Sequence, residues 1–183
     1  MNVTLCKTAI FERVVRVHMD IRPATADDLD GINRVARASW EADYPEILSR
    51  ETVSAGVDEW YGAAAFADEL EWAHTLAFVA TADDEPVGFV HAMWAGEEGH
   101  VLRLYVHPDH RREGVGTALL ERVRSELYDR DIERIDAMVL ADNELGKAFY
   151  ERFGFEAADE SETTIGGEQY RETRYTLTDS GDS

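Results

Sequence analysis

The fold of this chain is decided by one stretch: Leu104-Tyr105-Val106-His107-Pro108-Asp109-His110-Arg111-Arg112-Glu113-Gly114-Val115-Gly116-Thr117. An apolar run stops at a proline, a loop with two glycines follows, and an amphipathic stretch over 115–130 predicts a helix. The amino end of a helix directs backbone N–H groups and the positive end of its dipole to one point. Glycines let a ligand approach the main chain closely, and the two arginines add positive charge. The stretch therefore predicts an anion site between a strand and a helix.

Two other kinds of phosphate-binding loop do not fit this stretch. A P-loop needs Gly-Lys followed by Ser or Thr, and the stretch contains no lysine. A dinucleotide fingerprint needs a third glycine where Leu119 stands, and it opens on an N-terminal strand–loop–helix unit that this chain lacks. We therefore set aside a P-loop and an oxidoreductase that binds a dinucleotide.

A second motif follows one strand later. After a strand-like run over 134–140, Asn143 opens a short helical stretch that continues through Gly146 and Tyr150 and ends in Phe153-Gly154-Phe155. The rest of the chain reads as a first strand from Met19, as helical over 26–44, and as helical over 49–72 with breaks near Gly56 and Gly62. Strands are predicted over 75–82, 86–94 and 100–106, and a hairpin over 160–165 and 168–177. There are no repeats and no internal linker. The pattern predicts one α+β domain with a mixed sheet.

The two motifs together resemble those of the GNAT N-acetyltransferase superfamily. Arg111-x-x-Gly114-x-Gly116 resembles its acetyl-CoA pyrophosphate loop, and Asn143-x-x-Gly146-x-x-x-Tyr150 resembles its second motif, at the expected distance. The resemblance covers residues 19–177. It implies the GNAT fold, a central twisted and mostly antiparallel sheet flanked by helices, with a splay between the fourth and fifth strands. The family often has alanine at the position of Gly146, and glycine weakens a short helix.

The resemblance implies acetyl-CoA as co-substrate and assigns residues to it. Main-chain groups of Leu104, Tyr105 and Val106 would pair with the pantetheine arm inside the splay, and Asn143 would bond the same region. The pyrophosphate would be held by N–H groups of the loop, which comprises Arg111, Arg112, Glu113, Gly114, Val115, Gly116 and Thr117. We expect the Glu113 carboxylate to point outward, away from the pyrophosphate.

The resemblance also implies catalytic roles for two residues. Tyr150 would lie beside the thioester sulfur as general acid, because a phenol suits a thiolate leaving group. In relatives of the histone and arylalkylamine type, the base lies six residues before the position of Val106, which is His100 here. We expect the His100 side chain to share a face with Leu102 and Leu104. The plainer interpretations are a core tyrosine at 150 and a solvated histidine at 100.

Three residues are predicted to line the pocket for the acceptor amine. Relatives place the region of Trp40 and Tyr44 over the acceptor, although the helical spacing of the two also fits core positions. Glu98 lies just beyond His100 and could act as a base through water. We expect no metal ligands, because His107 and His110 lack a completing set of carboxylates or cysteines.

The chain is strongly acidic. Its 183 residues include 38 acidic and 18 basic side chains, with a formal net charge of −20, and only Lys7 and Lys147 are lysines. The acids are spread along the sequence, which favours adaptation of the surface to a salt-rich cytosol, as in a halophile, over an acidic functional patch. At about 1 M salt the Debye length is about 3 Å, so this self-repulsion would be screened. Without a basic footprint, we expect no nucleic-acid partner.

Cysteine content and hydropathy indicate the compartment in which the protein works. The single cysteine, Cys6, excludes an internal disulfide, and no apolar run is long enough for a membrane helix. We expect a cytoplasmic protein that is a monomer or a homodimer and has no membrane partner. Residues 1–18 read as an N-terminal extension or a start-codon miscall, and 178–183 as a polar tail.

The sequence therefore predicts an acetyl-CoA-dependent N-acetyltransferase. It would move an acetyl group to a primary amine by direct transfer in a ternary complex. The acceptor stays open between a small molecule and a protein amino group, and another acyl group could replace acetyl. The alternative is a non-catalytic GNAT-fold acyl-CoA sensor or regulatory protein, against which the presence of Tyr150 and Asn143 argues.

Overall fold

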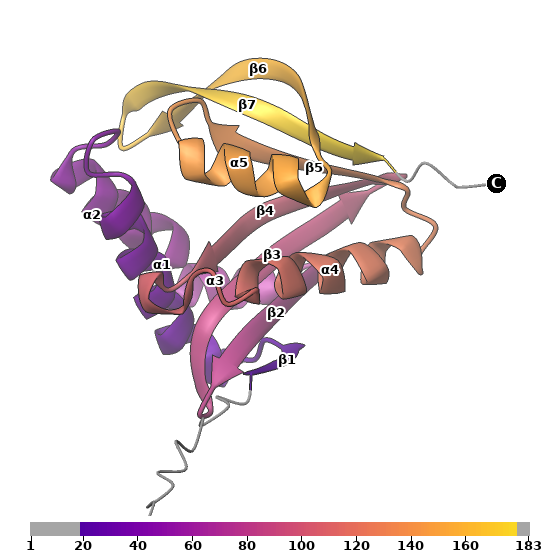
Figure 1. Ribbon diagram of the computed structural model, residues 1–183. Coiled ribbons are helices and arrows are strands. Elements are labelled where there is room, and N and C mark those ends of the chain that lie inside the picture. Colours follow the sequence, from indigo (N-terminus) through magenta and orange to yellow (C-terminus); the bar gives the residue numbers. More distant parts are fainter. Residues whose placement is uncertain (1–18, 179–183) are drawn as a thin grey trace, which may run out of the picture.

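A seven-stranded sheet organises the chain in the computed structural model, which describes residues 19–178 (Figure 1). The strand order is β1-β2-β3-β4-β5-β7-β6. The elements are β1 (Met19–Pro23), α1 (Leu29–Asp43), α2 (Arg50–Tyr61), α3 (Ala63–Leu70), β2 (Thr75–Ala82), β3 (Glu85–Ala95), β4 (Glu98–Val106), α4 (Val115–Tyr128), β5 (Arg134–Leu140), α5 (Glu144–Phe153), β6 (Glu156–Ile165) and β7 (Glu168–Thr178). The predicted extension over 1–18 and most of the predicted tail lie outside the described residues.

The sheet is mixed, as the sequence predicts, and it opens between β4 and β5. Every neighbouring pair is antiparallel except β4 and β5, which run parallel. Those two strands pair only from Glu98 opposite Arg134 to Val101 opposite Ala137. Beyond that point β4 continues to pair with β3 as far as Val106, while β5 turns to β7. The predicted splay between the fourth and fifth strands is confirmed.

Helices cover both faces of the sheet (Figure 1). Helix α4 buries the face that the sequence predicts, Val115, Leu119, Val123 and Leu127, against the strands, and α5 joins the same core cluster. On the opposite face, Ile32, Val35 and Trp40 of α1 form a second cluster with Val79 and Phe89. The sheet is therefore packed on both faces, and the splay opens within it, between β4 and β5. No helix within residues 19–178 is long and apolar enough to cross a bilayer.

A β-bulge at Leu102 changes which side chains share a face. In the register with β3, Val101 lies opposite Ala92 and Arg103 lies opposite His91, so Leu102 is an extra residue in β4. Because of this insertion, both Val101 and Leu104 pack in the cluster under α4. His100, the neighbour of Val101, points to the other face. The expectation that His100 shares a face with Leu104 is therefore wrong.

Strand β6 begins earlier than predicted. The sequence predicts a strand from 160, whereas β6 starts at Glu156 and pairs with β7 from there. Nearly all of its side chains are exposed because it is the edge strand. An edge strand exposed on both faces has no apolar alternation, so its first residues give no strand signal.

One histidine on β3 is fully buried in a polar network. His91 Nδ1 lies 3.0 Å from Arg103 Nη1, and Nε2 lies 2.8 Å from Thr75 Oγ1. Thr75 in turn donates to the carbonyl of Ala92, and Arg103 forms an ion pair with Glu69. Burial, and then the Arg103 charge, lower the pKa of His91 to about 4. The neutral ring accepts from Arg103 and donates to Thr75.

Candidate active site

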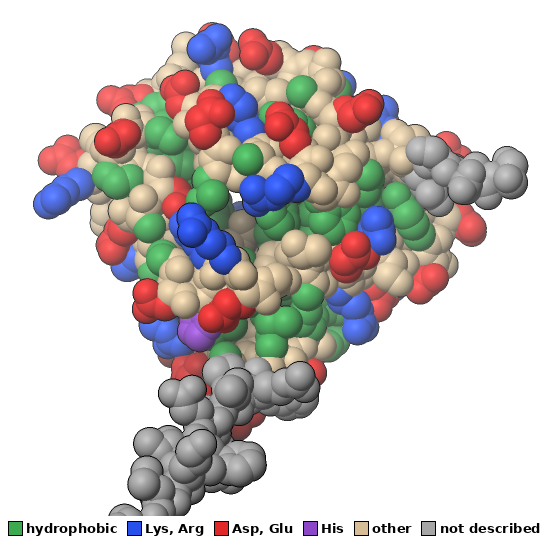
Figure 2. Space-filling view, in the orientation of Figure 1, with side chains coloured by type: hydrophobic (Ala, Val, Ile, Leu, Met, Phe, Trp, Pro, Cys, Tyr) green, Lys and Arg blue, Asp and Glu red, His purple; other side chains and the backbone are tan. Residues whose placement is uncertain are grey.

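A cavity of about 880 Å³ opens in the splay, and Figure 2 shows a hollow with basic side chains beside it. Its walls come from the end of α1, from β4 and the loop that follows, and from β5, α5 and the β6–β7 hairpin. The predicted site residues that line it are Trp40, Tyr44, Leu104, Tyr105, Val106, Arg111, Arg112, Gly114, Val115, Gly116, Thr117, Asn143 and Tyr150. The structure thus brings the two sequence motifs to one cavity.

The loop before α4 has the geometry of an anion site. Arg112 and Gly114 adopt left-handed φ values of 63° and 83°, and α4 begins at Val115 without a side-chain cap. The N–H groups of Val115, Gly116 and Thr117 therefore have no acceptor within the helix. Alternating left-handed residues gather successive N–H groups into a concave nest that favours anions. A side chain at 114 would be strained, which explains the glycine.

The basic residues around the cavity divide into paired and unpaired ones. The guanidinium of Arg111 donates to both Asp43 oxygens, at 2.6 and 2.8 Å, so its charge is already matched. Arg103 is matched by Glu69 in the same way. Arg112 and Arg152 also line the cavity, and neither has an ion pair among residues 19–178. In a chain with a net charge of −20, two unmatched arginines at one cavity favour an anionic ligand.

The predicted outward position of the Glu113 carboxylate agrees with its surroundings. Glu113 does not line the cavity, and its side chain is 59% exposed. Its carboxylate lies 3.5 Å from His110 Nδ1. The acidic residue within the loop therefore adds no carboxylate to the anion site.

The open edge of β4 offers a narrower set of main-chain groups than expected. The His107 N–H donates to Val87 of β3, whereas the Val106 carbonyl accepts from Ser39 Oγ at 3.3 Å and Arg111 Nε at 3.2 Å, away from β3. The N–H and C=O groups of successive residues point to opposite sides of a strand, so the main-chain groups of Leu104 and Val106 point into the splay. The main-chain groups of Tyr105 point to β3, so the structure does not direct them to the cavity. The Val106 N–H and both Leu104 groups remain for a ligand.

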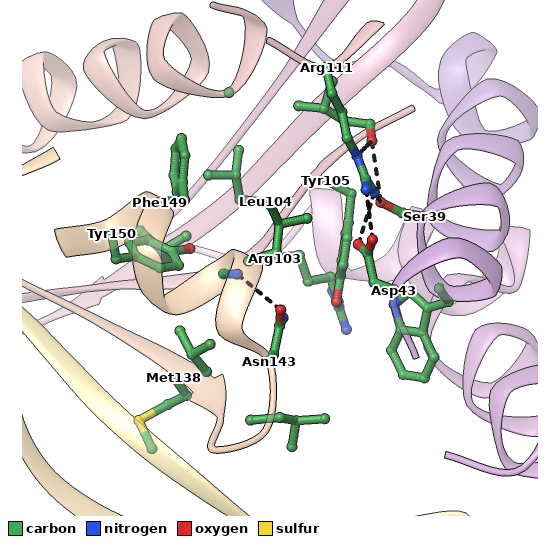
Figure 3. Close-up of a pocket in the computed structure, with 18 of the residues that line it drawn as sticks. Ser39, Asp43, Arg103, Leu104, Tyr105, Arg111, Met138, Asn143, Phe149 and Tyr150 are labelled. Atoms are coloured by element: carbon green, nitrogen blue, oxygen red, sulfur yellow. Dashed lines mark hydrogen bonds and ion pairs between the residues drawn. The ribbon is translucent and has the colours of Figure 1, made fainter. Parts of the chain in front are cut away.

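Asn143 caps α5 and reaches across to α1. Its Oδ1 accepts from the Gly146 N–H at 2.9 Å (Figure 3). Its Nδ2 donates to the Tyr44 hydroxyl at 3.3 Å. A Cβ atom at position 146 would lie 2.8 Å from that Nδ2, so a larger residue there would require the Asn143 side chain to shift. Glycine at this position therefore leaves room for the Asn143 cap.

Tyr150 lies at the base of the cavity with its ring in the core. The ring packs edge-to-face against Phe149 and Phe155, at centroid distances of 5.3 and 5.1 Å. Its hydroxyl points toward the space between Leu104 and Asn143 (Figure 3). Burial raises the pKa of Tyr150 well above its ordinary value, so the phenol stays protonated at neutral pH and can donate.

Besides Glu113, two residues predicted for catalysis and for the acceptor pocket lie outside the cavity lining. His100 and Glu98 belong to the part of β4 that is still paired with β5, before the splay opens. The Glu98 carboxylate accepts from Arg134 at 3.0 Å. The Leu102 bulge puts His100 on the face opposite Leu104, so the count of six residues back from Val106 does not reach the cavity. The structure therefore brings neither Glu98 nor His100 to the cavity, and their roles at the acceptor stay predictions.

Sequence reasoning missed a carboxylate on the far wall. Glu172 of β7 lines the cavity, lies opposite Leu140 of β5, and accepts from Ser161 Oγ at 3.0 Å. Its neighbour Thr173 is buried, and Tyr175 belongs to the core under α5, so Glu172 faces the other way. Unlike Asp43, it has no ion pair within residues 19–178. The sequence shows the alternation of side chains along this strand, but it does not show that the side with Glu172 faces the cavity.

The polar groups of the cavity do not make a metal centre. Among residues 19–178, no group of three or more His, Cys, Asp or Glu side chains lies together as metal ligands would. Its titratable groups are the hydroxyls of Tyr44, Tyr105 and Tyr150, the carboxylates of Asp43 and Glu172, the imidazole of His110 and the guanidinium groups described above. Such a set can bind an anionic ligand and donate or accept protons at the centre.

Comparison with known proteins agrees with this geometry. The model of the acetyltransferase (GNAT) domain matches residues 73–157, which contain both sequence motifs. The chain is 27% identical over 161 residues to the spermidine N(1)-acetyltransferase of Thermoplasma acidophilum, a match that covers 86% of this chain and 98% of that one.

Two solved structures share the fold over most of their length. The PaiA N-acetyltransferase of Thermoplasma acidophilum, solved with coenzyme A, has a TM-score of 0.79 and 25% identity, covering 88% of this chain and 99% of its own. A GCN5-related N-acetyltransferase from Rhodopseudomonas palustris has a TM-score of 0.74 and 28% identity, covering 87% and 94%. In its splayed sheet, in the two motifs at one cavity and in its overall fold, the chain is therefore similar to acetyltransferases of the GNAT superfamily.

Proposed function

We propose that the protein is an N-acetyltransferase that transfers the acetyl group of acetyl-CoA directly to a primary amine in a ternary complex. The observation that carries the proposal is the anion site: an uncapped helix, a left-handed loop and two unmatched arginines share one cavity with a buried tyrosine hydroxyl. Coenzyme A combines an anionic end with a thioester that a hydroxyl can assist. The solved relative with coenzyme A adds support.

The residues present fit coenzyme A along the whole cavity. The N–H groups of Val115, Gly116 and Thr117 would hold the pyrophosphate, with Arg112 and Arg152 matching the phosphate charge. The arm would lie in the splay against the main chain of Leu104. A smaller anion would leave that strand edge unused.

The transfer needs a proton donor beside the sulfur that leaves and a proton acceptor beside the amine that attacks. The amine nitrogen attacks the thioester carbonyl, the C–N bond forms, and the C–S bond breaks with its electrons going to sulfur. The O–H of Tyr150 would stabilise the departing thiolate and protonate it. A second group must take the proton that the amine loses. We propose that Glu172, directly or through water, attracts the ammonium and accepts this proton.

The name of one relative suggests which amines to try first. That relative is a spermidine N(1)-acetyltransferase. We propose an aliphatic polyamine as the acceptor, because the unmatched Glu172 carboxylate suits a cation and the acidic surface attracts polycations. Protein N-termini and lysine side chains belong in the same panel as competitors. The non-catalytic acyl-CoA sensor would bind the cofactor but turn over none of them.

Binding of the cofactor is tested by thermal unfolding. Coenzyme A at a hundredfold excess over its Kd should add about 2.7 kcal/mol of stability and raise Tm by several degrees. ATP and NAD should raise it much less, since neither has an arm that fits the splay. The scans should be run in dilute buffer and in about 1 M salt, where the self-repulsion of the acidic chain is screened. Equal stabilisation by ATP would overturn the assignment to coenzyme A.

Substitution of the far-wall carboxylate tests the acceptor site. Glu172→Gln keeps the size of the side chain and the bond to Ser161 but removes the charge. We expect kcat/KM for a polyamine to fall about 10-fold to 100-fold, because hydrogen bonds to a charged group contribute about 1.5–3 kcal/mol. The Kd of coenzyme A should stay unchanged. Glu168→Gln on the same strand, whose carboxylate accepts from Tyr170, is the matched control. Equal rates for both variants would remove Glu172 from the mechanism.

A further inference from the structure

The carboxyl-terminal end of α1 is bound to the cofactor loop through a cluster of side chains. Arg111 Nη1 and Nη2 donate to the two oxygens of Asp43, Nη2 also donates to Ser39 Oγ at 2.9 Å, and Nε donates to the Val106 carbonyl (Figure 3). Ser39 itself donates to that carbonyl. Ser39 and Asp43 are one turn apart on α1, so they face the loop together.

This cluster uses the first arginine of the loop for contacts within the protein. Three of the Arg111 nitrogens have acceptors on α1 or β4, and Asp43 matches its charge. The Asp43 and Arg111 side chains are only 15% and 25% exposed, so water screens the pair weakly. A bidentate guanidinium–carboxylate pair fixes orientation as well as distance. The pair therefore fixes the backbone at Arg111, immediately before the left-handed Arg112 at which the nest begins.

The same helix end also reaches the opposite wall. Tyr44, the residue after Asp43, accepts from Asn143, which caps α5. Burial raises the pKa of Tyr44 well above its ordinary value, so this hydroxyl stays neutral. The end of α1 thus contacts the wall formed by β4 and its loop, and the wall formed by β5 and α5.

We propose that Asp43 is a positioning residue of the cofactor site, which acts through Arg111 to keep the loop over 111–117 in its anion-binding shape. This inference rests on the proposed function only for the identity of the anion. Without Asp43, the Arg111 side chain loses its bidentate acceptor and the loop samples other conformations. Cofactor binding must then order the loop again, at a cost in affinity. Once the cofactor is bound the loop has its shape, so the chemical step is unaffected.

The experiment compares Asp43→Asn with wild type in two measurements. In the free protein, hydrogen exchange at the His107, His110 and Ala118 amides, which all donate to backbone carbonyls, should speed up about 10-fold. In steady-state kinetics, KM for acetyl-CoA should rise about 10-fold while kcat changes less than about 2-fold. Asp43→Glu keeps the carboxylate and should recover most of the affinity. A residue that only stabilises the fold would not produce this split.

A second ion pair on α1 supplies the control. Asp58→Asn removes the acceptor of Arg37, a pair at 2.7 Å between α2 and α1 that is well exposed and remote from the cavity. It should leave both measurements at wild-type values. If Asp43→Asn matches Asp58→Asn in exchange and KM, the proposal is overturned; it is overturned too if exchange rises but KM does not. If wild type binds no coenzyme A, the proposed function fails, and exchange in the free protein still decides whether Asp43 orders the loop.

Discussion

Tyr150→Phe is expected to lower kcat by a factor of about 10² to 10⁴, or roughly 3 to 5 kcal/mol of barrier. The substitution removes only the hydroxyl, and the ring keeps its contacts with Phe149 and Phe155. The thiolate then leaves without a proton donor. Tm and the Kd of coenzyme A should change little, because on the proposed function the loop and the strand edge would supply most of the contacts to the cofactor. Steady-state rates and calorimetric binding measure the two effects separately.

Tyr175→Phe is the matched control for this result. Tyr175 stacks on Tyr150 at a centroid distance of 6.3 Å, but its hydroxyl donates to Glu151 outside the cavity. Loss of that hydroxyl should cost some stability and leave kcat near the wild-type value. A Tyr150→Phe enzyme that works at full rate would mean that water or another group protonates the sulfur.

The pH dependence of stability should report the buried His91. Its pKa is about 4 in the folded protein against about 6.5 in an unfolded chain, so the unfolded state binds more protons between these values. Stability is therefore complete above about pH 6.5 and falls as the pH drops toward 4. The whole effect is about 3 kcal/mol, of which roughly 2 kcal/mol is lost by pH 5. Denaturant unfolding at pH 8 and pH 5 measures it.

His91→Gln isolates this contribution from that of the carboxylates. A glutamine can still accept from Arg103 and donate to Thr75, and it does not titrate. The difference in unfolding free energy between pH 8 and pH 5 should shrink by about 2 kcal/mol relative to wild type. Identical pH dependence in wild type and His91→Gln would show that His91 is not buried as a neutral ring.

Local sequence patterns were sufficient for the parts of the site that a contiguous segment builds. The loop from Arg111 to Thr117 is strand, glycine turn and helix in sequence, so its anion geometry follows from local rules. The buried face of α4 follows from periodicity in the same way, whereas the splayed sheet was implied by the resemblance between motifs. The roles of Tyr150 and Asn143 were predicted from the resemblance to the family's two motifs. That resemblance includes the distance between the motifs, which no single helix or strand reveals.

The parts that could not be predicted depend on register and on contacts distant in sequence. The bulge inserts Leu102 into β4, and neither a glycine nor a proline at that position signals it. The side chains of β4 before the bulge therefore point to the opposite face from the one that simple alternation predicts. His100 was misplaced for that reason. Glu172 was missed because its place depends on how β7 pairs with β5, more than 30 residues away in the sequence. The Asp43–Arg111 pair joins residues from α1 and the loop, which no local pattern connects.

The short ladder between β4 and β5 has a consequence for the life of the protein in a cell. The chain leaves its own sheet incomplete beyond Ala137, and on the proposed function the amide-bearing arm of the cofactor occupies the place of the missing strand pairing. A ligand that binds only the folded state lowers the fraction of opened chains in proportion to its concentration. Proteases act on the opened chains. The abundance of this enzyme would then follow the supply of its own co-substrate, without any separate regulator.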